Sequence, residues 1–163
     1  MNKKVWVGIG VVVLALAWYA FRPELLFVNK SVSESFPVGT AAANTNSAAP
    51  KQLAAGQFKG YAHETSGNAA IFQVDGKRVL RLTDFMTSNG PDVHVYLVAA
   101  ANVMDDATVK KAGFVDLGSM KGNVGDQNYD VPADVDLSKY QSVTIWCARF
   151  NVNFGTAPLS ASL

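Results

Sequence analysis

Residues 69–82 read Ala-Ala-Ile-Phe-Gln-Val-Asp-Gly-Lys-Arg-Val-Leu-Arg-Leu, and this stretch decides the fold class. Two runs rich in apolar residues, Ala69 to Val74 and Arg78 to Leu82, flank Asp75-Gly76-Lys77. Asp-Gly is a common tight turn of β-hairpins because both central residues must tolerate a positive φ angle. The stretch therefore predicts two antiparallel strands joined by a short turn.

The chain downstream of this hairpin continues as short strands. In the run Val93 to Val98, alternate residues face one side, with Val93, Val95 and Leu97 on the side predicted to be buried. Turn residues recur roughly every ten positions, which is the all-β signature. The sequence predicts an antiparallel β-sandwich or open barrel, with one or two helical turns between Ala101 and Lys111. Further strands are expected at Phe114 to Met120, Tyr129 to Pro132, Val143 to Phe150 and Val152 to Leu159, with a glycine-rich loop around Gly122 and Gly125.

The N-terminus carries an apolar segment. Lys3 and Lys4 precede an unbroken apolar run from Val5 to Phe21, near the short end of the roughly 17–25 residues that cross a bilayer. The basic flank favours a cytoplasmic N-terminus, which predicts a single-pass protein of the plasma (inner) membrane with its domain on the extracytoplasmic side. A cleaved signal peptide with a site at Ala15-Leu16-Ala17 is the alternative. The anchor is favoured because the run stays apolar past that site.

The remaining chain divides into a spacer and a domain. We expect the anchor over residues 1–28, a flexible linker over 29–55, which is rich in Ser, Ala, Asn and Thr, and the β-domain over 56–163. The domain contains nine basic and eleven acidic side chains, a formal charge of −2 without a basic cluster. Nucleic acid is therefore excluded as an expected partner, because binding it requires a concentrated positive face.

Several motifs in the domain resemble the DM-thirteen domain family, which is labelled for electron transfer. They include Phe58-x-Gly60-x-x-His63, Asn89-Gly90-Pro91-Asp92-Val93-x-Val95-Tyr96-Leu97, and the pair Trp146-Cys147 at the place of the family's hallmark cysteine. The resemblance implies a redox role for Cys147, as a bare thiol or as a haem ligand. Larger members carry cytochrome-type domains alongside, so here the electron donor or acceptor is expected to be another molecule, a redox or envelope protein.

Cys147 is the single cysteine, so its states are a free thiol, a bridge between two chains, or a cofactor ligand. Strand parity groups it with Val143 and Ile145 and predicts that it is buried, where a cysteine commonly behaves as a small hydrophobe. Trp146 is predicted to point to the other side. His63 and His94 are the two histidines, and both are expected at strand positions that face away from the core.

A cofactor held by Cys147 with His63, His94 and Trp146 is one interpretation, and the absence of any cofactor is the other. Blue copper is disfavoured because no His or Met follows the cysteine closely. Covalent haem is excluded by the lack of a C-x-x-C-H motif, whereas non-covalent haem or another metal stays open. Asp130, Asp134 and Asp136 are interpreted as turn and capping residues rather than calcium ligands.

Two functions follow from these observations. The first is a membrane-tethered extracytoplasmic redox domain that acts through Cys147. The second is a cofactor-free β-sandwich that binds a partner protein, a glycan or another envelope component, with Cys147 packing the core. No hydrolase or transferase motif is present in the sequence.

Overall fold

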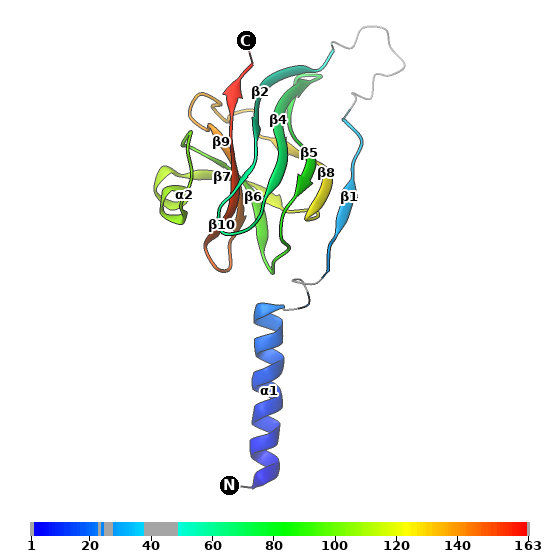
Figure 1. The fold of residues 1–163 in the computed structure, drawn as a ribbon, viewed down its shortest axis with the longest axis vertical. Coiled ribbons are helices and arrows are strands. Elements are labelled where there is room, and N and C mark those ends of the chain that lie inside the picture. The colour runs from blue at the N-terminus through cyan, green and yellow to red at the C-terminus, as the bar shows by residue number, and fades with distance from the viewer. Residues whose placement is uncertain (1, 23, 25–27, 38–48, 163) are drawn as a thin grey trace.

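The computed structural model describes residues 2–22, 24, 28–37 and 49–162. Over these residues the chain forms an N-terminal helix and a β-sandwich (Figure 1). The helices are α1 (Lys3–Phe21) and α2 (Asp106–Ala112). The strands are β1 (Ser31–Ser33), β2 (Lys51–Gln57), β3 (Lys59–Gly60), β4 (Ser66–Val74), β5 (Lys77–Met86), β6 (Val93–Val98), β7 (Phe114–Ser119), β8 (Val124–Val131), β9 (Ser142–Cys147), β10 (Val152–Pro158) and β11 (Ser160–Ala161).

Two sheets face each other across the core. In the described part of the chain, one sheet has the order β1-β8-β5-β4-β2-β11 and the other β3-β10-β9-β6-β7, and the two do not close into a barrel. Neighbouring strands are antiparallel except β1 and β8, which pair in parallel. The sandwich is therefore confirmed over the open barrel.

The hairpin that joins β4 to β5 is formed as predicted. Asp75 and Gly76 occupy the turn with φ angles of 47° and 79°, and Val74 pairs with Lys77. Two consecutive positive φ angles are the requirement of the tight turn that Asp-Gly satisfies. The strands extend beyond the predicted ends, to Ser66 and Met86.

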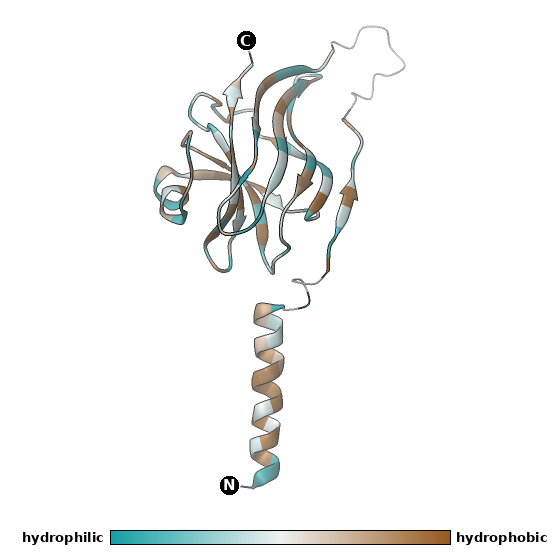
Figure 2. Cartoon of the chain, in the orientation of Figure 1, coloured by the Kyte–Doolittle hydropathy of each residue, from teal (hydrophilic) through white to brown (hydrophobic). Residues whose placement is uncertain are grey.

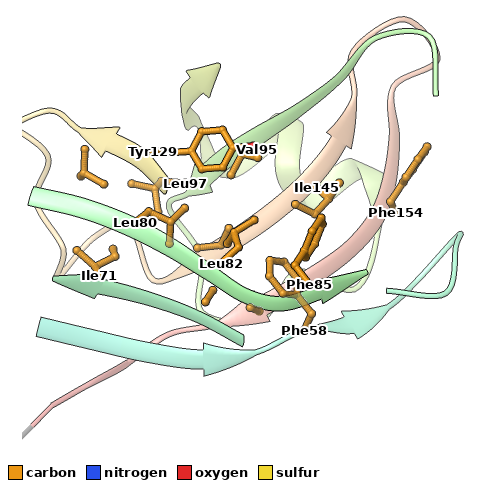
Figure 3. Packing of buried hydrophobic residues seen from close by; sticks show 14 of the residues in the cluster. Phe58, Ile71, Leu80, Leu82, Phe85, Val95, Leu97, Tyr129, Ile145 and Phe154 are labelled. Carbon is orange, nitrogen blue, oxygen red and sulfur yellow. The ribbon is translucent and has the colours of Figure 1, made fainter. Parts of the chain in front are cut away.

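The core lies between the two sheets and is made mainly of alternate residues from the central strands (Figure 3). Each fully buried Leu, Ile or Val side chain contributes about 1.5–3 kcal/mol relative to exposure. The central residues are Ile71 of β4, Leu80 and Leu82 of β5, Val95 and Leu97 of β6, and Ile145 of β9.

A second apolar cluster lies on the outer face of the β6–β9 sheet. Tyr96 and Trp146 pack there with Val98, Val103 and Val109. Val109 comes from α2, which confirms the helical turns predicted between Ala101 and Lys111. Every residue of β9 is buried as a result.

The flexible linker expected over 29–55 is corrected at both ends, since β1 and β2 lie within it. Both strands were missed because they have few large apolar side chains, and β1 in addition pairs with β8, more than 90 residues later in the chain. Glu34, next to β1, accepts a hydrogen bond from the backbone N–H of Asn128 (2.7 Å) and from Nζ of Lys121 (2.8 Å). Residues 38–48 of the linker lie outside the described residues.

The glycine-rich loop is also shorter than expected, because β8 begins at Val124. Gly125 lies inside this strand with a φ angle of 100°, beside the carbonyl oxygen of Val32 in β1. A Cβ atom at Gly125 would collide with that oxygen. Gly125 thus permits the close approach of β1. The sequence pattern had instead predicted that this glycine forms a turn.

Helix α1 projects from one end of the sandwich and buries no residue (Figure 1). Its middle is apolar and its N-terminal end hydrophilic (Figure 2). Among the described residues it is the one helix long and apolar enough to cross a membrane, a property that an N-terminal signal sequence shares.

Candidate functional site

Cys147 is the last residue of β9, and its side chain belongs to the core between the sheets. It is 1% exposed and is a free thiol. Its register partners are Val93 of β6 and Val152 of β10. The burial predicted from strand parity is confirmed.

A cavity of about 340 Å³ adjoins Cys147 at the end of the sandwich nearest α1. Its wall combines the turn after β9, the loop before β6, the bend before β4 and the last residues of α1. The lining residues are Phe21, Arg22, His63, Asn89, Gly90, Pro91, Cys147, Phe150, Val152 and Phe154. Most of these side chains are apolar or aromatic, which is typical of sites for small organic ligands.

The end of α1 is attached to this part of the domain by two contacts. Nη1 of Arg149 donates to the carbonyl oxygens of Ala20 (2.7 Å) and Tyr19 (3.3 Å). The ring of Phe21 stacks on that of Phe150, with centroids 5.8 Å apart. The last carbonyls of a helix have no partner within the helix, and a cation there also suits its dipole. Arg149 therefore fixes the helix end beside the cavity.

His63 lies in a bend between β3 and β4, not in the strand position that was expected. Its ring packs on Phe154 with centroids 3.9 Å apart, and its backbone N–H donates to the carbonyl of Phe154 (3.3 Å). Burial lowers the pKa of the imidazole, because desolvation disfavours the charged form. His63 is therefore half-buried at the cavity wall and neutral at pH 7, instead of facing away from the core.

His94 and Trp146 lie on the opposite face of the same sheet and are cross-strand partners. Nδ1 of His94 is 2.9 Å from Asp116, and its Nε2 is 3.2 Å from Asp92. Trp146 is buried in the outer cluster beside Tyr96, with ring centroids 6.3 Å apart. The structure thus brings Cys147 and His63 to one cavity and leaves His94 and Trp146 outside it.

Sequence reasoning did not find Arg149 or Phe21 as residues of the site. Arg149 contacts a helix about 130 positions earlier in the chain, a separation that leaves no local pattern. Phe21 reads as the last apolar residue of the predicted anchor. The one sequence pattern that could have indicated the cavity is that Phe150 and Phe154 follow Cys147 closely.

The donor set limits which groups the site can hold. Within the described residues, no group of three or more His, Cys, Asp or Glu side chains is placed to hold a metal ion. Cys147 and His63 offer one thiol and one imidazole, which suit a group that brings most of its own ligands, such as haem. Asp136 accepts hydrogen bonds from the N–H and hydroxyl of Ser138 (2.9 and 2.7 Å), a turn contact like the one predicted for it.

No curated protein and no solved structure matches this chain. A family model described as "Electron transfer DM13" matches residues 57–159, which is more than half of the chain and includes Cys147 and His63. The chain therefore belongs to the Electron transfer DM13 family.

Proposed function

We propose that this protein is a membrane-tethered electron-transfer domain on the extracytoplasmic side of the plasma (inner) membrane. The redox site is the cavity lined by Cys147 and His63. The family assignment supports the electron-transfer role. The apolar helix α1, with Lys3 and Lys4 at its start, supports the tether and its orientation.

The observation that carries this proposal is the shared cavity. Cys147 and His63 are far apart in the sequence, yet both line the same apolar space next to the end of α1. A thiolate and a neutral imidazole are donors that redox-active groups use as ligands, and such a group when bound would store an electron. The buried side chain of Phe154 would help to keep water from it.

The volume of the cavity bears on the kind of group. At about 340 Å³ it is near the lower limit of the roughly 300–1,000 Å³ of small-molecule sites. A group with one or two rings matches this volume better than a four-pyrrole macrocycle does. If no group is resident, the Cys147 thiol itself is the redox element, and it must meet another molecule through this cavity.

A second function, binding of an envelope component without a cofactor, is favoured by a different surface. A groove of about 520 Å³ lies on the outer face of the β2–β4–β5 sheet. Its wall contains Phe36 and Phe72, in edge contact with centroids 5.0 Å apart, and the guanidinium of Arg81, 5.7 Å above the Phe36 ring. Gln52 and Asn68 add amide groups. Aromatic and amide side chains together suit a glycan.

An absorption spectrum of the protein purified from its native membranes, oxidised and then reduced with dithionite, tests the proposed function. A visible band that shifts on reduction, and that is lost or moved in Cys147→Ala or His63→Phe but kept in His94→Phe, is the expected result for a bound group. His94→Phe is the matched control because His94 lies outside the cavity. A flat spectrum together with unchanged electron transfer by Cys147→Ala would refute the proposal and favour the binding module.

A further inference from the structure

We propose that the cavity beside Cys147 binds the ring of a membrane-soluble quinone. This inference rests on the proposed electron-transfer function and names the class of electron carrier. Three features carry it, namely the place of the cavity, its shape, and its few polar groups.

The place of the cavity favours a ligand that arrives from the bilayer. Phe21 and Arg22 of its wall stand where the apolar segment of α1 gives way to charge, which is where a spanning helix leaves the hydrocarbon region. Arg149 holds this helix end against the domain. A carrier dissolved in the membrane therefore reaches the cavity at the membrane surface.

The shape of the cavity favours a flat ring. Three of its lining residues are phenylalanines, and two of them, Phe21 and Phe150, are already stacked on each other. The third, Phe154, packs against the His63 ring. Flat aromatic groups stack on such faces, and the volume of about 340 Å³ suits one or two fused rings.

The polar groups favour a neutral ligand that accepts hydrogen bonds. Arg22, His63 and Asn89 carry N–H groups, and the described residues that line the cavity include no carboxylate. Nε of Arg22 donates to Glu24 (2.9 Å) and the amide of Asn89 donates to the carbonyl oxygen of Val28 (3.2 Å), so a ligand would be met by the remaining N–H groups of these two side chains and by the ring of His63. A cationic ligand would have no counter-charge among these residues, and an acyl chain has no acceptor for hydrogen bonds from the N–H groups. A quinone is a flat, neutral ring whose two carbonyl oxygens only accept hydrogen bonds. Among electron carriers that dissolve in a bilayer, it fits all three features.

Photolabelling of the full-length protein in lipid nanodiscs tests this proposal. The probe is an azidoquinone, and the modified peptides are identified by mass spectrometry. Decylubiquinone is used as the competitor, because its fully substituted ring has no free position to which the Cys147 thiol could add. An isoprenoid alcohol without a ring is the control competitor. The test variant is Phe150→Ala and its matched control is Phe114→Ala, because the two phenylalanines are 45% and 44% exposed and Phe114 does not line the cavity.

The expected result is labelling of the peptides that contain Phe150 and Phe154, displaced by decylubiquinone and not by the alcohol. Loss of one aromatic contact should weaken this competition roughly two- to ten-fold in Phe150→Ala and leave it unchanged in Phe114→Ala. Labelling confined to the apolar run of α1, equal displacement by the alcohol, or identical behaviour of the two variants would overturn the proposal.

The two proposals fail in different ways. Photolabelling needs neither a resident redox group nor the thiol of Cys147. A flat spectrum with displaceable labelling would therefore refute a resident group and leave the quinone site standing. A redox-active spectrum without displaceable labelling would refute the quinone and leave the proposed function.

Discussion

Replacing Cys147 by serine tests whether the thiol lies in a dry part of the core. The side chain is 1% exposed and lies among apolar neighbours such as Val93 and Ile145. Burying a hydroxyl without a hydrogen-bond partner costs roughly 1–3 kcal/mol. Alanine at the same position loses only the contacts of the sulfur, at about 1 kcal/mol by comparison with one buried methyl group. Serine should therefore be the more destabilising replacement, although it is closer in shape.

Unfolding of both variants by urea and by heat measures this difference. We expect Cys147→Ser to unfold at a lower temperature than Cys147→Ala, by about 4 °C for each kcal/mol in a domain of this size. Both variants remove the thiol, so the comparison is independent of redox chemistry. If serine proves as stable as alanine or more stable, a polar partner such as water in the adjoining cavity reaches this position, and the argument for a dry thiol is refuted.

Three further predictions concern the site and its supports. Burial lowers the pKa of His63 in the folded state below that in the unfolded chain, so the unfolded chain binds more protons between these two pKa values and the stability of the domain should fall as the pH drops below about 6.5. Thermal unfolding of His63→Phe between pH 7 and pH 5 should lack the part of this fall that His63 causes. Gly125→Ala should destabilise the domain by more than about 1 kcal/mol and increase hydrogen exchange in β1. Gly118→Ala is the control, since Gly118 has a similar φ angle of 111° but open space around it, and this variant should show only the cost of a side chain at a positive φ angle. Arg149→Gln should leave the unfolding of the domain unchanged but widen the distribution of distances between spin labels on α1 and on the domain, because Arg149 holds the end of α1 through its hydrogen bond to Ala20. An unchanged distance distribution would contradict this role of Arg149.

The parts of the fold that could be predicted are those specified by neighbours in the sequence. The hairpin follows from Asp75-Gly76, and the alternation in β6 correctly placed Val93, Val95 and Leu97 in the core. Strands β1 and β2 could not be found in this way. Strand β1 pairs with β8, more than 90 residues later in the chain, and Gly125 leaves room for it. Strand β2 has few large apolar side chains that could have shown a strand pattern.

The candidate site could be predicted only in part, for the same reason. Strand parity correctly placed Cys147 in the core and Trp146 on the other side of β9. It failed for His63, because the chain bends before β4 and alternation does not apply to a bend. The cavity could not be predicted at all, since it forms where the end of α1 meets three other segments that are distant in the sequence.

Strand β9 is buried on both faces, so Cys147 and Trp146, which are adjacent in the sequence, contact different parts of the molecule. Cys147 faces the cavity, while Trp146 packs under α2 with Tyr96. A group bound in the cavity can touch the thiol and His63, but Trp146 has the sheet between itself and that group. Any effect of Trp146 on electron transfer must therefore act through the backbone of β9 or through the outer cluster. A Trp146→Phe variant that kept the domain folded should leave ligand contacts in the cavity intact, whereas a change at His63 should alter them directly.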